Sequence, residues 1–239
     1  MYLKLIILIL FLTCNLNSAE KEINENKIES IIKKYILENP EVIIESLEKF
    51  TVSQKEKEKE DIVNILSNFY DKKEYLKLPS IGNKKNDLII VEFIDYNCGY
   101  CKKTLNTVRK LHKNIDNIRI VFIDFPILSE NSRMAAKASL ASNNQNSYFK
   151  YHSELLKHQG PFTKEVLLKL AEKLSLNIKK FEQDMESEDI KNRIEQNISL
   201  AENFNIRGTP TFLLGNRILA GAYDYNKLKN IINNRKKED

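Results

Sequence analysis

The stretch Asp87–Lys113, DLIIVEFIDYNCGYCKKTLNTVRKLHK, decides how this chain folds. Its first part, residues 87–95, is a short β-branched run bounded by polar residues, which is typical of a buried strand. Its last part, residues 102–113, repeats apolar residues every three or four positions, as an amphipathic helix does. Cys98 and Cys101 lie between the two. The stretch therefore predicts a strand, a Cys-Gly-Tyr-Cys segment and a helix in direct succession.

The residues that follow predict an α/β domain. Residues 118–125 read as a second apolar strand that ends at Pro126, and an intervening helix would make the two strands a parallel, right-handed crossover. The periodicity from 132 to 204 is almost purely helical, with Ser132 and Thr163 as candidate helix caps. Two more strands and a closing helix are predicted at 211–214, 217–220 and about 224–234.

The segment before this domain reads as a helical arm. Apolar residues recur at helical spacing from Lys27, and Asn39–Glu41 predicts a second helix through a cap, a first-turn proline and a first-turn acid. Lys and Glu alternate over 54–61, which predicts a solvated helix or a flexible hinge, before a short helix over 62–69. We place the domain boundary near Pro79. The arm is too small for its own core, so it packs on the next domain or pairs with copies of itself.

The first residues have the layout of an export signal. Lys4 precedes an unbroken apolar run over residues 5–12, and small and polar residues follow over Asn15–Ala19. This run is too short for a membrane-spanning helix, which needs about 20 residues. We predict a signal peptide over residues 1–19 that is cleaved after Ala19, so that the mature chain is exported. An uncleaved anchor and lipid attachment at Cys14 are the alternatives.

Composition excludes several classes of protein. Hydrophobic residues make up 42% of the 239 residues and charged residues 30%, as in a globular protein rather than a disordered one. The net charge of +5 is too small and too evenly spread to predict binding to nucleic acid. Removal of the signal peptide leaves only Cys98 and Cys101. A bridge between them closes too small a loop to stabilise the fold much, so we expect a chemical role.

Cys98 lies at the amino end of the predicted helix, which favours a reactive thiolate. Unpaired N–H groups and the helix dipole stabilise an anion there, so the pKa of Cys98 should fall below the ordinary value of about 8.5. Cys101 lies one turn further in, where it can resolve a mixed disulfide that Cys98 forms with substrate. The alternative is that the two cysteines supply half of the ligands of a zinc site. Structural zinc requires four ligands, and the only further candidates are three histidines, which we expect to be packed in the fold instead. These are His112, His152 and His158.

Gly208–Phe212, with the sequence GTPTF, is the second chemical feature. Pro210 stands at the mouth of a predicted strand after residues of turn character, which is compatible with a cis Thr209–Pro210 bond. An ordinary proline on an edge strand is the alternative.

Taken together, these motifs resemble the DsbA-type protein disulfide oxidoreductases. The resemblance rests on Val91–Phe93, on Cys98–Cys101, on a long helical insertion and on Gly208–Phe212, in this order and spacing. It covers about residues 80–234. It implies a thioredoxin fold, which is an α/β fold, with a large helical insertion.

The resemblance also implies roles for single residues. It makes Pro210 the cis-proline that faces the cysteine pair and, with Thr209, offers backbone to an incoming peptide. It makes Cys98 and Cys101 a redox-active disulfide. It places Glu92 where such proteins keep a buried acid that exchanges a proton with Cys101. A solvent-facing strand residue is the alternative for Glu92.

Gly99 and Tyr100, between the cysteines, differ from the Pro-His of the strongest oxidants of the family. Without that histidine, Cys98 should be less acidic and its disulfide less oxidising. Gly-Tyr, and Thr209 before the proline, are instead similar to the bacterial isomerases. Oxidase and isomerase both stay open, because they use the same residues and differ only in the resting redox state.

The arm carries a further resemblance. Residues Tyr35–Glu41 are similar to the amino-terminal helical arm of ScsC-like and Com1-like DsbA relatives, some of which form trimers through it. The expected organisation is then a signal peptide, a helical arm and a DsbA-like thioredoxin domain with an insertion. Their ranges are 1–19, 20–78 and 79–239, with the insertion at about 130–204.

The sequence as a whole predicts a periplasmic thiol:disulfide oxidoreductase that forms or reshuffles disulfide bonds in exported proteins. No cofactor is required, because the cysteine pair carries the electrons, and a membrane redox partner would recycle that pair. We expect clients to bind an apolar groove around Tyr100, Thr209 and Pro210, walled by the insertion. A copper-binding or chaperone-type module that uses the same cysteines is the alternative, because thiolates suit Cu(I).

Overall fold

The computed structural model describes residues 25–83 and 85–235. The predicted signal peptide, residues 1–19, lies outside this range. By contacts between residues, the chain divides into two units, Met1–Lys57 and Glu58–Asp239. Across the described residues, no helix combines the length and the apolar character that crossing a membrane requires.

The described part of the first unit is helical. It holds α2 (Glu25–Glu38) and most of α3 (Glu41–Asp71), which begins at Glu41 as predicted. The side chain of Asn39 does not cap α3; its amide donates to the carbonyl of Tyr35 at 2.8 Å and closes α2 instead. Residues 54–61 form a solvated helix, which confirms that alternative over the hinge, and residues 62–69 continue it as part of α3 rather than forming a separate helix. Lys and Glu are good helix formers, so an alternating charged run continues a helix without packing.

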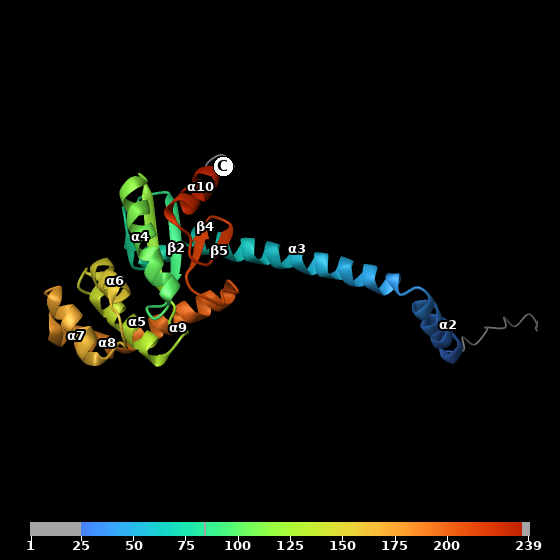
Figure 1. Cartoon of the computed structure of the whole chain (residues 1–239), viewed down its shortest axis with the longest axis horizontal. Helices are drawn as coiled ribbons and strands as arrows, with labels where there is room; N and C mark the ends of the chain where they lie inside the picture. The colour runs from blue at the N-terminus through green and yellow to red at the C-terminus, as the bar shows by residue number, and fades with distance from the viewer. Residues whose placement is uncertain (1–24, 84, 236–239) are drawn as a thin grey trace, which may run out of the picture. The chain divides into compact units, whose positions relative to one another are not determined.

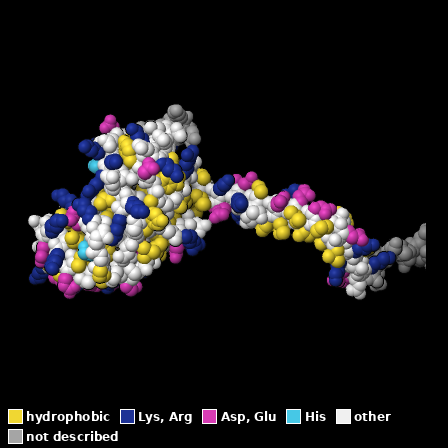
Figure 2. Space-filling model, viewed as in Figure 1, with side chains coloured by type: hydrophobic (Ala, Val, Ile, Leu, Met, Phe, Trp, Pro, Cys, Tyr) yellow, Lys and Arg dark blue, Asp and Glu magenta, His cyan; other side chains and the backbone are white. Residues whose placement is uncertain are grey.

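Large apolar side chains of the first unit are exposed along both helices. Figure 2 shows apolar side chains gathered in a band along the described helices of this unit. The exposed ones are Ile28, Ile31, Ile32, Tyr35, Leu37, Val42, Ile43, Ile44, Leu47, Phe50 and Val52. We call this set the arm stripe. A helix with so many exposed apolar residues is typical of one that packs against a partner.

The second unit is built on a five-stranded sheet in the order β1-β3-β2-β4-β5. Figure 1 labels β2, β4 and β5 of this sheet. Its strands are β1 (Ser80–Ile81), β2 (Leu88–Ile94), β3 (Ile118–Asp124), β4 (Thr211–Leu214) and β5 (Arg217–Ala220). Strands β2 and β3 are parallel, and the other neighbours are antiparallel. Helix α4 (Gly99–Asn114) connects the parallel pair, which confirms the predicted crossover.

The two faces of β2 enter two different cores, because successive side chains of a strand point to opposite faces. Leu88, Ile90 and Ile94 share one core with residues of α4 and of the insertion. The odd-numbered residues of β2 share the other core with Leu66 and Phe69, from the end of α3. Since α3 covers this face with its last turns, the compact unit begins at Glu58 rather than near Pro79.

Five helices form the insertion between β3 and β4, as the periodicity predicts. They are α5 (Glu130–Asn143), α6 (Tyr148–Lys157), α7 (Lys164–Lys173), α8 (Ile178–Met185) and α9 (Glu188–Asn203), and α10 (Tyr225–Arg235) closes the fold. Thr163 caps α7, which confirms that prediction. The predicted cap at Ser132 is wrong, because Ser129 Oγ accepts the N–H of Ser132 at 3.2 Å and so caps α5.

Candidate active site

Cys98 is the residue at which the β2–α4 loop turns into α4. It is the N-cap, with extended backbone (φ −75°, ψ 115°), and its carbonyl accepts the N–H of Lys102 at 3.1 Å. Its Sγ lies 3.2 Å from the carbonyl oxygen of Thr209. Both Cys98 and Cys101 are free thiols, so the structure shows the reduced form of the predicted disulfide pair.

The pKa of Cys98 is lowered to about 5. The largest cause is a hydrogen bond from the thiol of Cys101, and the Thr209 side chain and the backbone N–H groups of Cys101 and Tyr100 act in the same direction. Burial opposes them. The helix amino terminus, expected to be the main cause, is therefore only a contributor, and the neighbouring thiol stabilises the thiolate most.

Cys101 has the opposite character. It is fully buried, and this burial, followed by the hydrogen bond to Cys98, raises its pKa above the ordinary value. One turn of α4 thus carries a thiol that ionises readily and a thiol that stays protonated. This asymmetry allows Cys98 to act as nucleophile and Cys101 to follow, because the thiolate is the reactive form.

Glu92 lies beneath the pair on β2 and is only 1% exposed, so the solvent-facing alternative is wrong. The hydroxyl of Thr104 donates to its Oε1 at 2.7 Å. Burial raises the pKa of Glu92 to about 7, and the Thr104 hydrogen bond opposes that shift. The Glu92 carboxylate is also one of the groups that raise the pKa of Cys101. An acid that titrates near neutral pH lies within electrostatic reach of the buried thiol.

The Thr209–Pro210 peptide bond is cis, which confirms the prediction from the sequence. Antiparallel pairing of β4 with β2 sets Phe212 opposite Glu92. This register brings the turn before β4 to the end of β2, where Cys98 follows. The carbonyl of Pro210 accepts the N–H of Gly221 at 2.8 Å, so the turn is held from its other side.

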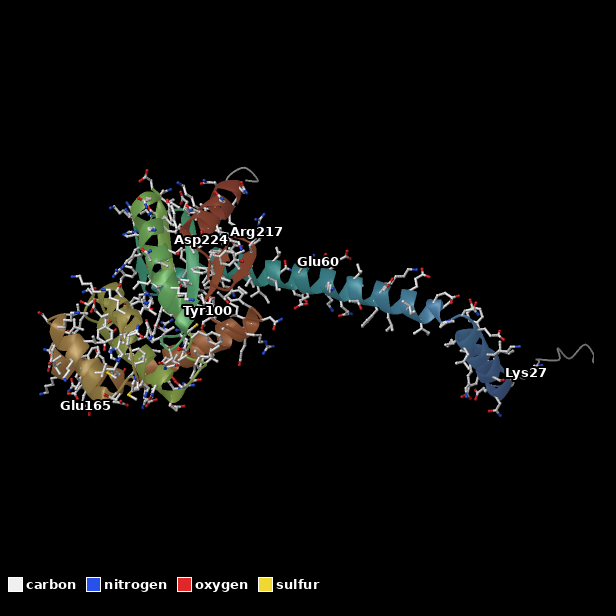
Figure 3. All side chains as sticks on the ribbon, in the orientation of Figure 1. Lys27, Glu60, Tyr100, Glu165, Arg217 and Asp224 are labelled. Atoms are coloured by element: carbon white, nitrogen blue, oxygen red, sulfur yellow. The ribbon has the colours of Figure 1, made fainter. Side chains whose placement is uncertain are left out.

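The two residues between the cysteines face solvent. A Cβ added to Gly99 would find no atom within 4 Å, so packing does not require glycine there. Tyr100 is 63% exposed, with Lys103 Nζ 5.1 Å from its ring centroid, and Figure 3 labels it at the start of α4. Cys98 therefore borders an open surface that a polypeptide could approach.

The histidines divide between buried and exposed positions. His152 is fully buried, with its ring centroid 4.7 Å from that of Phe122, and burial lowers its pKa to about 3. His158 packs on Phe162, but His112 is exposed, so the expectation of packing is wrong for His112. In the part of the chain that the structure describes, no group of three or more His, Cys, Asp or Glu side chains could hold a metal ion.

Sequence reasoning missed the residues that surround the pair. Thr104 touches Glu92, and the buried Asp95 accepts one backbone N–H group of the loop before Cys98 and two of the loop before α5. The only signal in the sequence is an aspartate three residues before Cys98, where a turn follows a strand. Asn97 is a local partner, but Ile127 and Leu128 lie 32 and 33 residues further along the chain, so local pattern could not identify them.

Comparison with known proteins gives two family matches. Residues 74–234 match the thioredoxin family, and residues 25–57 match the N-terminal domain of the copper resistance protein ScsC. The Na(+)/H(+) antiporter NhaA 3 of Salinispora tropica is 30% identical over 149 residues, which are 62% of this chain and 23% of the antiporter. The chain therefore spans less than a quarter of the antiporters' length. The probable disulfide bond formation protein D of Bacillus cereus is 28% identical over 163 residues, 63% of this chain and 76% of that protein.

Solved structures agree with these matches. The thiol-disulfide exchange protein alpha-DsbA2 from Wolbachia pipientis superposes with a TM-score of 0.68 at 28% identity, over 74% of this chain and 96% of that one. A linker-deleted mutant of ScsC from Proteus mirabilis has a TM-score of 0.68 at 22% identity, over 93% of this chain and 100% of that one, which shows a shared fold. Because the thioredoxin match covers more than half of its residues, this chain belongs to the thioredoxin family, and its relatives place it among the DsbA-type members.

Proposed function

We propose that this chain is a thiol:disulfide oxidoreductase that forms or reshuffles disulfide bonds in exported proteins, with Cys98 and Cys101 as its catalytic pair. The observation that carries the proposal is the opposite shift of the two thiol pKa values within one turn of α4. At neutral pH Cys98 is a thiolate beside Thr209 and the open surface, while Cys101 remains a buried, protonated thiol.

As an oxidase, the protein starts from the Cys98–Cys101 disulfide. A client thiolate attacks Sγ of Cys98, a client–Cys98 disulfide forms, and Cys101 leaves as a thiolate. The second client thiolate then attacks the client sulfur, and Cys98 leaves as the stabilised thiolate. The client loses two electrons, which the cysteine pair takes up. The low pKa of Cys98 favours this last step, because a more acidic thiol leaves faster.

As an isomerase, the protein starts reduced. The Cys98 thiolate attacks a wrong client disulfide, the freed client thiolate attacks another client disulfide, and a final exchange releases Cys98 with no net transfer of electrons. Cys101 releases the protein from clients that do not rearrange. Oxidase and isomerase thus share every residue of the site.

Glu92 supports both cycles as the proton-transfer group for Cys101. A thiol with a raised pKa leaves poorly as a thiolate and attacks poorly as a thiol, so it needs an acid in one direction and a base in the other. A carboxyl group whose pKa is about 7 can serve as either near neutral pH. Thr104, which bonds Glu92 at 2.7 Å and lies 2.8 Å from the Cys101 carbonyl, holds this carboxyl below the pair.

This chemistry requires client proteins and a redox partner. Clients are exported proteins that meet Cys98 at Tyr100, Thr209 and Pro210, and the predicted signal peptide supports a periplasmic location. A membrane redox partner recycles the cysteine pair, by reoxidising it for an oxidase or by reducing it for an isomerase. The reaction needs no further cofactor.

The proposal is tested by reduction of insulin and by refolding of scrambled ribonuclease with the wild-type protein. We expect catalysis of at least one of these, and the redox state of the pair in the cell then separates the cycles: mostly oxidised for an oxidase, mostly reduced for an isomerase. The second candidate is a copper-binding module, which the match to a copper resistance family and the two adjacent thiols favour. Tight Cu(I) binding without any thiol exchange would support it and overturn the enzyme.

The arm stripe predicts the assembly state, for which we propose a homotrimer. Glutamate at Ile32 and at Leu47, which are 52% and 59% exposed, would place charges in the apolar contact between copies. We expect light scattering to give a mass of several chains for the wild type and of one chain for the Ile32→Glu, Leu47→Glu variant. Lys33→Glu, on the exposed surface of α2, is the control and should not change the mass. A wild-type protein with the mass of one chain would contradict the proposal.

A further inference from the structure

Asp95, Tyr96 and Asn97, the three residues between β2 and Cys98, all bond to the insertion or to the loop that enters it. Phe125–Ser129 is this loop, and it links β3 to α5. The N–H of Phe125 donates to the carbonyl of Ile94 at 2.8 Å, so the loop starts beside the end of β2. The β2–α4 loop and the insertion loop thus leave neighbouring parallel strands side by side.

The Asp95 side chain is 1% exposed, and both of its carboxylate oxygens accept backbone hydrogen bonds. Oδ1 accepts the N–H of Asn97 at 2.8 Å. Oδ2 accepts the N–H groups of Ile127 and Leu128 at 2.9 and 3.0 Å. The backbone carbonyl of Asp95 accepts the N–H of Cys98 at 3.1 Å. A single residue therefore holds the turn before the nucleophile and the start of the insertion loop.

Asn97 and Tyr96 reinforce the same junction. The amide of Asn97 donates to Ser129 Oγ and Ser132 Oγ, each at 3.0 Å. The hydroxyl of Tyr96 lies 2.7 Å from a carboxylate oxygen of Asp124 and 2.7 Å from Ser139 Oγ of α5. None of these contacts takes part in the proton and sulfur chemistry of the pair. Their common effect is to set the insertion relative to Cys98.

We propose that Asp95 is a positioning residue that fixes the insertion loop beside Cys98, an inference that rests on the proposed function. Burying a carboxylate is costly unless its oxygens are hydrogen-bonded, and here three backbone N–H groups satisfy them. Asparagine cannot replace it. Its single amide oxygen can accept a hydrogen bond either from the N–H of Asn97 or from the N–H groups of Ile127 and Leu128. Its NH2 group, which is a donor, would then face the remaining N–H donor without forming a hydrogen bond.

The loop that Asp95 holds presents apolar side chains to solvent. Ile127 is 40% exposed and Leu128 is 55% exposed, although the backbone N–H groups of both are anchored. A polypeptide client whose cysteine reaches Cys98 would also contact these side chains. A small disulfide would contact only the sulfur of Cys98. Asp95 should therefore matter for protein clients more than for small ones.

The test compares two substrates of wild type, Asp95→Asn and Leu128→Ser. Scrambled ribonuclease is the protein client, and a small aromatic disulfide reports on Cys98 alone. We expect kcat/KM for ribonuclease to fall about tenfold in both variants, which is the effect of about one lost contact. The rate with the small disulfide should stay within about twofold in Leu128→Ser. In Asp95→Asn, which also loosens the turn before Cys98, that rate should fall much less than the ribonuclease rate. In Asp95→Asn, amide hydrogen exchange at Ile127 and Leu128 should become faster. Asp116→Asn, at an exposed aspartate, is the control and should leave all three readouts unchanged.

An equal fall with both substrates would overturn the proposal, because Asp95 would then act on Cys98 or on the fold as a whole. Unchanged amide exchange in Asp95→Asn, or an unchanged ribonuclease rate in Leu128→Ser, would also overturn it. Leu128→Ser keeps the test decisive if Asp95→Asn does not fold. A wild-type protein that exchanges with neither substrate would instead overturn the proposed function, and the positioning role with it.

Discussion

Replacing Cys98 with serine is expected to lower the rate of thiol exchange by roughly 10³-fold or more, the scale on which loss of a nucleophile acts. A serine hydroxyl does not ionise near neutral pH, so neither the Cys101 hydrogen bond nor the helix N–H groups can create an anion there. The rate of wild-type Cys98 with a small disulfide should follow its ionisation, with an inflection near pH 5 and a plateau above it. The measurement is a series of such rates from acid to neutral pH.

Cys101→Ser is the matched variant, one helical turn away. It keeps the nucleophile and removes the resolving thiol, so it should trap client–Cys98 mixed disulfides that non-reducing electrophoresis detects. The reverse pattern, trapping by Cys98→Ser and inactivity of Cys101→Ser, would contradict the assignment of the two roles. It would mean that the buried thiol, not the N-cap thiol, meets the client.

Replacing Glu92 with glutamine is expected to slow the steps that protonate or deprotonate Cys101 by roughly 100-fold, which is typical of a lost general acid or base. The first attack at Cys98 should hardly change, because the amide leaves the N-cap and Thr209 in place. Stopped-flow measurement of the release of mixed disulfides separates the two steps. In the wild type the release rate should change near pH 7, where Glu92 titrates, and this dependence should vanish in the variant.

The same substitution should change stability with a definite sign. Burial raises the pKa of Glu92 from 4.5 to about 7. A group whose pKa is raised in the folded state contributes stability that is fully present below the unfolded pKa and is lost as pH rises through the folded value. Above about pH 7, Glu92→Gln should therefore melt higher than the wild type by about 10 °C, and the difference should shrink toward pH 4.5.

Glu172→Gln, on the exposed surface of α7, is the control for both experiments. It removes one carboxylate without touching the site, so the release rate and the pH dependence of melting should match the wild type. A Glu92→Gln protein that behaves like this control would show that the buried carboxyl does not exchange protons with Cys101. Asp124 is another buried acid whose pKa is raised to about 7, and it remains in both variants.

Much of the second unit could be predicted from sequence because its signals are local. The apolar run of β2, the helical spacing after Cys101 and the turn before β4 each depend on residues a few positions apart. The helix caps depend on more than the local sequence. Ser129 and Ser132 are both good N-cap residues, and only the bond from the N–H of Ser132 to Ser129 Oγ decides between them.

The residue at which the second helix of the arm ends could not be predicted from neighbouring residues. An alternating Lys–Glu run is equally compatible with a solvated helix and with a hinge. In the structure α3 runs through it because Lys and Glu are good helix formers, and Leu66 and Phe69 then pack beneath the sheet and hold its last turns in place up to Asp71. That packing depends on strands that lie later in the chain.

The sequence by itself determined the order of strand, cysteine pair and helix, the cysteine that lies at an N-cap, and the residues that carry a family likeness. Hydrophobic periodicity, cysteine spacing and capping are properties of neighbouring residues, so they can be read before the chain folds. The tertiary structure alone decided which groups surround those sulfurs. Thr209 lies 111 residues from Cys98 in the chain, and Ile127 lies 32 residues from Asp95, yet each pair is in hydrogen-bond contact. Such contacts exist because the sheet sets neighbouring strand ends together, and strand pairing is a long-range property of the fold.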